Sequence, residues 1–194
     1  MKYQEIIGNL IELSLSGSFD VIAQGNNCQN AQGAGIAPQF VKAFGTDRFE
    51  LEHNNFKGDV NKLGNIDYEL RNIKNPKSKV FPKMEGFIKG EDFFVVNCYT
   101  QFMYSTNHTD GISKPLDYEA LTLCLRKINH IFKGKHIGLP GFIGGGLAGG
   151  NIDIIRSIIQ KELKDMDVTI VFLEQNKHLM LNGKIFNQNN SYRK

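Results

Sequence analysis

Residues 141–151 read G-F-I-G-G-G-L-A-G-G-N and follow a short apolar run at 136–139 that predicts a strand. After them, Ile152, Ile155, Ile159 and Leu163 recur at helical spacing, and Asn151 is a favourable N-cap for that helix. Six glycines between residues 140 and 150 cost conformational entropy, which is expected only where the backbone approaches another group closely. This stretch, called loop two, therefore predicts a strand–loop–helix unit with a ligand at the loop.

A second glycine-rich stretch, called loop one, covers residues 24–37 and reads Q-G-N-N-C-Q-N-A-Q-G-A-G-I-A. It follows a predicted buried strand at 19–23 and runs into a predicted helix at 36–44, which Gly45 ends. Ligands bind at the carboxyl ends of strands in open α/β sheets, and amides at a helix N-terminus bind anions. Two such loops are suited to hold a diphosphate from both sides, although a single G-x-G is more often a structural turn.

The other segments complete an α/β pattern. We expect a buried central strand at 93–99, a helix at 118–132, an exposed lysine-rich loop at 72–79 and a polar loop at 100–115. Further strands are predicted at 3–7, before Gly64, at 66–70 and at 168–173. Strands alternating with helices predict a mixed sheet with helices on both faces. No repeat or boundary divides the 194 residues, so we expect one domain with a polar tail from about residue 187.

Composition restricts the class of protein. The net charge of +3 is too small to indicate a nucleic-acid-binding protein, and no apolar run reaches the ~20 residues of a membrane helix. Cys28, Cys98 and Cys124 are odd in number and widely spaced, which argues against a disulfide framework and a zinc site. Without a signal-peptide pattern, we expect a cytoplasmic protein that binds no metal and no membrane.

The glycines of loop two are also compatible with a different class of protein, one that binds a dinucleotide. Gly144, Gly146 and Gly149 have the G-x-G-x-x-G spacing of a dinucleotide-binding fold. That fold needs an acidic residue at the end of the following strand, and Glu174 comes after the strand instead. An NAD-dependent oxidoreductase is therefore the weaker interpretation. A P-loop is excluded because no Gly-Lys-Ser/Thr follows either loop.

Four segments in order carry a resemblance to a known family: G-N-L at 8–10, loop one with the strand before it, V-V-N-C-Y-T-Q at 95–101, and L-P followed by loop two. Together they resemble the macrodomain family over residues 3–173. The resemblance is closest to the branch with the ADP-ribose 1″-phosphate phosphatases and the terminal ADP-ribose glycohydrolase. It implies an α/β fold, a three-layer α/β/α sandwich with a central mixed twisted sheet. It also implies ADP-ribose or a derivative as ligand, and no cofactor.

The resemblance also implies roles for individual residues. Asn9 matches the position that recognises the adenine amino group, although an ordinary turn residue is the simpler interpretation. Asn27 matches the asparagine near the distal ribose, and loop two matches the segment whose amides hold the phosphates. The ADP-ribose-binding residues expected in this way are Asn9, Leu10, Gly25, Asn27, Gly33, Ala34, Gly35, Ile36, Thr100, Gln101, Ile143, Gly144, Gly145, Gly146, Leu147 and Ala148.

Several positions depart from the family pattern. Gln24 stands where this branch often has histidine, and Asn151-Ile152 replaces Asp-Trp. Gln101 stands where the glycohydrolase has its nucleophilic lysine, and Ala148 where it has its catalytic aspartate. These departures argue against a covalent glycohydrolase mechanism. They leave a phosphatase or a purely binding protein.

The leading hypothesis is hydrolysis of the terminal phosphate of ADP-ribose 1″-phosphate by a monomer. Asn27 would orient the distal ribose and His108 would activate a water, although a solvated loop histidine is commoner. The alternatives are a non-catalytic ADP-ribose reader or sequestering module, and a hydrolase that removes ADP-ribose from macromolecules. A nucleophilic Cys28 is disfavoured because a C-x5-R phosphate cradle would need arginine where Ala34 stands. Phe102 and Tyr104 are candidates for stacking on a base.

Overall fold

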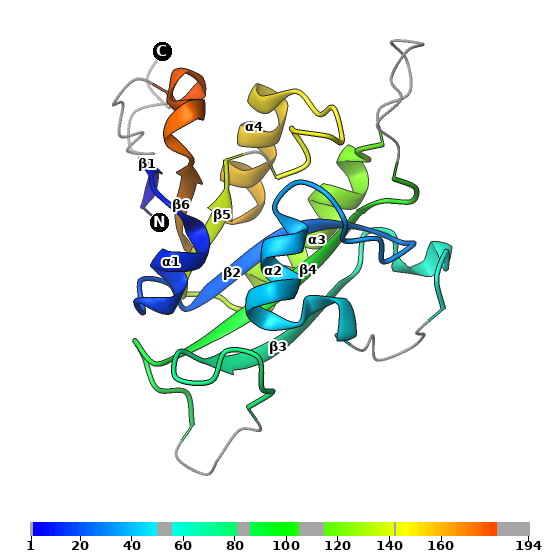
Figure 1. Cartoon of the computed structure of the whole chain (residues 1–194). Coiled ribbons are helices and arrows are strands. Elements are labelled where there is room, and N and C mark those ends of the chain that lie inside the picture. Colours follow the sequence, from blue (N-terminus) through cyan, green and yellow to red (C-terminus); the bar gives the residue numbers. More distant parts are fainter. Residues whose placement is uncertain (1, 50–55, 81–85, 105–114, 142, 182–194) are drawn as a thin grey trace.

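A six-stranded mixed sheet forms the middle of the protein (Figure 1). The computed structural model describes residues 2–49, 56–80, 86–104, 115–141 and 143–181. The strand order is β1-β6-β5-β2-β4-β3, in which β3 runs antiparallel to β4 and all other neighbours are parallel. The strands are β1 (Tyr3–Ile7), β2 (Val21–Asn27), β3 (Ile66–Asn72), β4 (Asp92–Gln101), β5 (His136–Pro140) and β6 (Asp167–Phe172).

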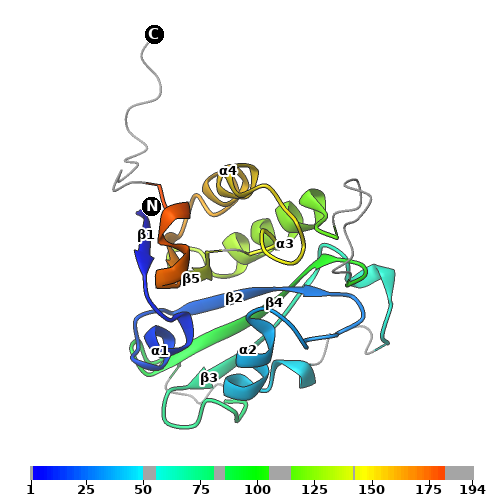
Figure 2. The ribbon, with the colours of Figure 1, turned by 45° about the horizontal axis from the view of Figure 1, so that its top comes forward.

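Helices cover both faces of the sheet, as Figure 2 shows. On one side lie α3 (Tyr118–Ile131) and α4 (Ile152–Glu162), whose buried residues share an apolar cluster with Val21, Ala23 and Val96. On the other side lie α1 (Leu10–Leu15) and α2 (Ala37–Phe44), which pack on Ile22 and Val95. Neighbouring strand residues point to opposite faces, so each strand contributes to both clusters. The expected three-layer α/β/α arrangement is confirmed.

Three short 3₁₀ turns complete the elements: η1 (Thr46–Arg48), η2 (Val60–Lys62) and η3 (Glu174–Leu179). The strand predicted before Gly64 is wrong, because η2 occupies that segment. The Asp59 side chain accepts a hydrogen bond from the Asn61 amide, and such local bonding competes with strand pairing. The sequence pattern does not predict helix α1. This helix has six residues and buries only Leu10 and Ser14, too few to produce a helical stripe.

Both β2 and β4 extend further than the apolar pattern predicts. Gln24 pairs in register with Asn97, and Asn26 with Tyr99, so loop one begins inside β2. Thr100 and Gln101 likewise belong to β4 rather than to the following loop. The backbones of these polar residues still pair with the neighbouring strand. A prediction from hydrophobicity ends each strand too early, because it stops where the apolar run stops. The tail from residue 187 lies outside the described residues.

The topology places both glycine loops at one edge of the sheet. Because β1, β6, β5, β2 and β4 are mutually parallel, their carboxyl ends all meet there (Figure 1). Loop one leaves β2 and loop two leaves β5, which are adjacent strands. We call this the carboxyl edge. Within the described part of the chain, no helix is long and apolar enough to cross a bilayer.

Candidate ligand-binding site at the carboxyl edge

The first half of loop one is held by its own side chains. The Asn27 Oδ1 accepts a hydrogen bond from the Ala31 amide at 3.0 Å, and its Nδ2 donates to the Ala31 carbonyl at 2.8 Å. Asn30 has a φ of 53° and donates from Nδ2 to the Asp47 carbonyl. Asn27 is buried, and these two bonds let its amide shape the loop while using one donor and one acceptor position.

The second half of loop one presents unpaired backbone amides. Among the described residues, the N–H groups of Gly33 through Ala37 have no hydrogen-bond acceptor. Ile36 occupies the N-cap of α2 and supplies no side-chain cap, whereas Asn9, Asp117 and Asn151 cap α1, α3 and α4. An uncapped helix N-terminus carries partial positive charge and free donors, which together form an anion site.

Loop two presents a second set of unpaired amides. The N–H groups of Gly144, Gly145, Gly146 and Ala148 likewise have no acceptor among the described residues. The loop folds on itself through a bond from the Gly150 amide to the Gly144 carbonyl at 2.9 Å. Its carbonyls therefore close the turn while these amides stay available to an outside acceptor.

Not every glycine of the two loops serves a ligand. A Cβ on Gly144 would lie 2.6 Å from Leu116 Cδ1, and one on Gly150 would clash with the same side chain. These two glycines allow loop two to pack on Leu116, whose importance the sequence did not indicate. By contrast, a Cβ on Gly33 would meet no protein atom within 4 Å. Gly33 therefore borders open space at the carboxyl edge.

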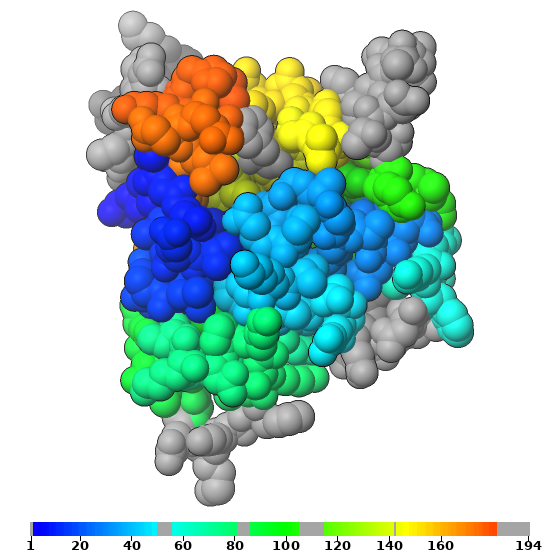
Figure 3. Space-filling view, viewed as in Figure 1, coloured from blue at the N-terminus to red at the C-terminus, as the bar shows by residue number. Residues whose placement is uncertain are grey.

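The two loops approach one another. A Cβ on Gly35 would lie 3.9 Å from Leu147 Cδ1, and the two loops lie next to each other in the space-filling view (Figure 3). A Cβ on Gly25 would lie 3.2 Å from Thr100 Oγ1 and 3.6 Å from the Gly144 nitrogen. The Thr100 hydroxyl is buried and has no hydrogen-bond partner among the described residues. The ends of β2 and β4 and the start of loop two thus converge.

The segments that form the site have no cationic side chain. Residues 8–10, 24–37, 100–104 and 140–151 contain neither lysine, arginine nor histidine. Burial raises the pKa of the Cys28 thiol to about 11, which favours the protonated thiol at neutral pH and disfavours Cys28 as a nucleophile. The described arrangement can bind an anion through backbone amides, and its own side chains provide no general base.

The remaining predicted residues fall partly at the two ends of this edge and partly within the loops. Asn9 caps α1, where its Oδ1 accepts hydrogen bonds from the Ile11 and Glu12 amides at 3.0 and 3.4 Å, and Leu10 is buried in the core. Gln101 ends β4 and donates from Nε2 to the Met103 carbonyl. Ile143 and Ala148 are buried, whereas Ala34 is exposed. His108 lies outside the described residues.

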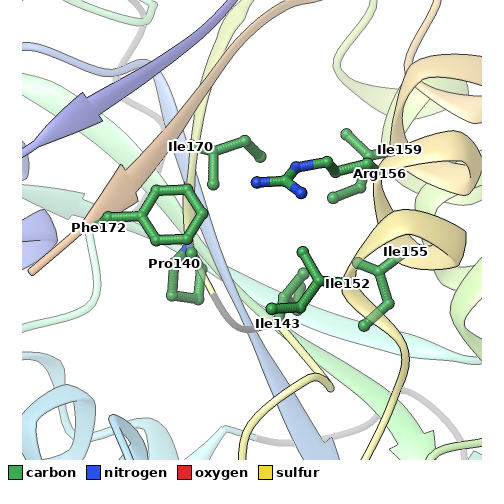
Figure 4. A pocket seen from close by; sticks show the side chains of 9 residues that line it. Pro140, Ile143, Ile152, Ile155, Arg156, Ile159, Ile170 and Phe172 are labelled. Atoms are coloured by element: carbon green, nitrogen blue, oxygen red, sulfur yellow. The ribbon is translucent and has the colours of Figure 1, made fainter. Parts of the chain in front are cut away.

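Two hollows lie away from these amides. One, of about 10 Å³, lies beneath loop two between Ile155, Ile159, Ile170 and Phe172, with the Arg156 side chain extending into it (Figure 4). It has room for at most one water. The other, of about 210 Å³, lies at the opposite edge of the sheet, where polar side chains such as His136 and Thr169 bond each other. Neither hollow is lined by the amides described above.

Sequence reasoning also missed a buried group of polar side chains behind loop one: Gln24, Gln32, Thr46 and Asn97. The sequence does contain one indication of this group: Asn97 is an amide side chain inside the apolar run at 93–99. Gln24 stands out in the sequence only as a departure from the family pattern.

Comparison with known proteins gives few sequence relatives and many structural ones. No family model matches the chain. It is 29% identical over 178 residues to an uncharacterised 17.5 kDa protein from the tk-vs intergenic region of Enterobacteria phage T4, covering 88% of this chain and 95% of that protein.

Solved structures of similar fold include a Bacteroides thetaiotaomicron protein of unknown function, with a TM-score of 0.60, 19% identity and coverage of 89% and 99% of the two chains. The macrodomain of Mycobacterium tuberculosis DarG has a TM-score of 0.53 at 16% identity, with 87% of this chain and 96% of that one covered. Thermosipho africanus DarTG in complex with ADP-ribose matches with a TM-score of 0.56 at 12% identity, over 90% of this chain and 43% of that one.

Proposed function

We propose that this chain, whose fold is that of the macrodomains, binds ADP-ribose along its carboxyl edge. One observation carries the proposal: loop one and loop two bring two sets of unpaired backbone amides together at this edge. A diphosphate placed between them would accept hydrogen bonds from both loops and interact favourably with the α2 dipole. The ADP-ribose complex of the similar Thermosipho africanus protein supports this choice of ligand.

The strand order supports an elongated ligand. Asn9 follows β1, loop two follows β5, loop one follows β2, and Gln101 ends β4. The two loops therefore lie between Asn9 and Gln101, and β1 and β4 are four strand spacings apart, about 19 Å. We place the adenine near Asn9, the diphosphate between the loops, and the distal ribose near Thr100 and Gln101. Most residues expected from the resemblance then lie along one ligand, whereas the buried side chains of Leu10 and Ile143 support the edge from the core.

A substitution at Gly33 tests this placement. Because a side chain there meets only open space, Gly33→Val should leave the fold intact and project into the proposed diphosphate position. We expect the affinity for ADP-ribose, measured by calorimetric titration, to fall at least about tenfold, or about 1.4 kcal/mol. Gly33→Ala should have a smaller effect. Lys161→Val, at an exposed position in the last turn of α4, should have none. Wild-type protein that does not bind ADP-ribose would refute the proposal.

Hydrolysis of ADP-ribose 1″-phosphate is the further activity that we propose, and it depends on His108. The described side chains of the site supply no general base, so the activity requires His108, which lies outside them. Phosphate release should therefore be measured for the wild type and for His108→Ala. Turnover that this substitution abolishes, with unchanged ADP-ribose affinity, is expected for the phosphatase. Binding without turnover in the wild type would indicate a reader or sequestering module.

A further inference from the structure

The polar group behind loop one forms a connected hydrogen-bond network, in which only the Gln24 Oε1 has no partner among the described residues. Gln32 in loop one accepts at Oε1 from the Thr46 hydroxyl at 2.6 Å and from Gln24 Nε2 at 3.0 Å. Its Nε2 donates to Asn30 Oδ1 at 3.0 Å and to the Thr46 carbonyl at 3.1 Å. All four hydrogen-bonding positions of this amide are therefore used, although the side chain belongs to a loop.

Gln24 and Asn97 connect this loop amide to the sheet. Both side chains are fully buried, and Gln24 Nε2 donates to Asn97 Oδ1 at 2.8 Å. Asn97 Nδ2 donates to the Thr46 carbonyl at 3.0 Å. The reversed orientation of the Gln24 amide would set its oxygen against the acceptors on Gln32 and Asn97, so the orientation is fixed.

The network joins segments on either side of α2. Gln32 precedes this helix, while Thr46 follows its C-cap Gly45. Through Gln24 and Asn97 both segments are fastened to β2 and β4. The amides of residues 33–37 lie between these two attachments in the sequence and have no acceptor among the described residues. Their direction therefore depends on the network as well as on the packing of α2 against the sheet.

We infer that Gln24, Gln32, Thr46 and Asn97 are positioning residues, which hold loop one and the N-terminus of α2 in the anion-binding conformation before ligand arrives. This inference rests on the proposed function. A loop that is already ordered loses less conformational entropy when it binds, so the network contributes affinity without touching the ligand. The effect should be confined to ligands whose second phosphate and distal ribose reach loop one.

Thr46 allows a nearly isosteric test. Thr46→Val removes the hydroxyl that donates to Gln32 and keeps the side-chain shape, while Thr46→Ser keeps the hydroxyl. In the free protein, we expect Thr46→Val to speed hydrogen exchange of the Cys28, Asn30 and Ala31 amides about five- to tenfold. The affinity for ADP-ribose should fall by a similar factor, whereas the affinity for AMP, which lacks the distal ribose, should change less than twofold. Thr46→Ser should restore wild-type values.

Gln32→Met provides a second variant and Gln4→Met its matched control. Gln4 is a partly buried glutamine at the opposite edge of the sheet, where its Nε2 donates to Thr169 Oγ1. Gln32→Met should reproduce the Thr46→Val pattern, and Gln4→Met should alter neither loop-one exchange nor the ADP-ribose to AMP affinity ratio.

Unchanged exchange in loop one, or an equal loss of affinity for ADP-ribose and AMP, would overturn the inference. Failure of the proposed function is recognised separately, because the wild type would then bind neither ligand. In that case the exchange rates alone decide whether the network holds the loop.

Discussion

At the scale of single residues, Asp67 has the least ordinary environment. Its carboxyl is buried on β3, where the Tyr99 hydroxyl donates to Oδ2 at 2.7 Å and Oδ1 has no partner among the described residues. Burial raises the pKa of Asp67 to about 7, although the Tyr99 hydrogen bond and the nearby Lys62 charge oppose this shift. Near neutral pH, ionisation of Asp67 places a negative charge beside the Tyr99 hydroxyl.

This pKa predicts a dependence of stability on pH. An unfolded aspartate has a pKa of about 3.9, so between about pH 4 and pH 7 the folded state holds a proton that the unfolded state has lost. Stability should therefore fall as pH rises through this window, by up to about 1.4 kcal/mol per pH unit, and the contribution should level off above pH 7.

Asp67→Asn should remove this component, which urea unfolding at a series of pH values between 5 and 8 will measure. Asp47→Asn, at an exposed carboxylate, is the control and should keep the wild-type slope. An Asp67→Asn protein with the wild-type slope would show that Asp67 does not titrate in this range.

At the scale of elements, the helices differ in whether a side chain caps the free backbone amides of their first turn. Asn151 Oδ1 accepts from the Asp153 and Ile154 amides at the start of α4, as the sequence predicts. At the start of α2, Ile36 offers no acceptor. An uncapped N-terminus loses about 1 kcal/mol of stability relative to a capped one. We interpret the missing cap of α2 as the requirement of an anion site, because a capping side chain would occupy the donors.

The cap of α4 should therefore contribute to stability without contributing to binding. Asn151→Ala is expected to lower the free energy of unfolding by about 1 kcal/mol, and Asn151→Asp, which keeps an acceptor, by much less. ADP-ribose affinity should change less than twofold in both variants. A large affinity loss in Asn151→Asp would indicate that this residue contacts the ligand directly.

At the scale of the whole molecule, a buried ion pair connects the first strand to the last helix. Arg156 of α4 donates to both carboxylate oxygens of Glu5 on β1, at 2.8 and 3.2 Å, and the two side chains are 12% and 4% exposed. Arg156 also donates to the Leu179 carbonyl, and Glu5 accepts from the Leu181 amide. The pair thus holds β1, α4 and the segment after β6 together.

Breaking this pair from one side should be costly. Glu5→Gln leaves the largely buried guanidinium with only the exposed Asp153 carboxylate as counter-charge, and it should destabilise the protein by about 3 kcal/mol. The double variant Glu5→Gln with Arg156→Met should lose less than the sum of the two single losses, because it leaves no uncompensated charge. Urea unfolding of the four proteins measures this coupling. Simple additivity would show that the two side chains do not interact in solution.

The sequence by itself determined the type of most elements and the location of both loops. The apolar run at 93–99 and the helical stripe at 118–132 are each longer than one turn or strand repeat, so local periodicity suffices to identify them. The glycines of loop two likewise indicate close packing or a ligand through their local density alone. The local sequence pattern did not identify two elements. At Val60–Lys62 a side-chain hydrogen bond stabilises a turn instead of a strand, and the six-residue α1 buries too few residues to show a helical stripe.

Only the tertiary structure decided which of these parts act together. The strand order brings Asn9, both loops and Gln101 to one edge, and it sets Gln24 beside Asn97, 73 residues away. It also shows that the amide of Asn27 closes loop one upon Ala31, whereas the backbone amides of residues 33–37 remain unpaired. The physical reason is range: periodicity and capping act within a few residues, but the hydrogen bonds that shape the site depend on which distant strands become neighbours.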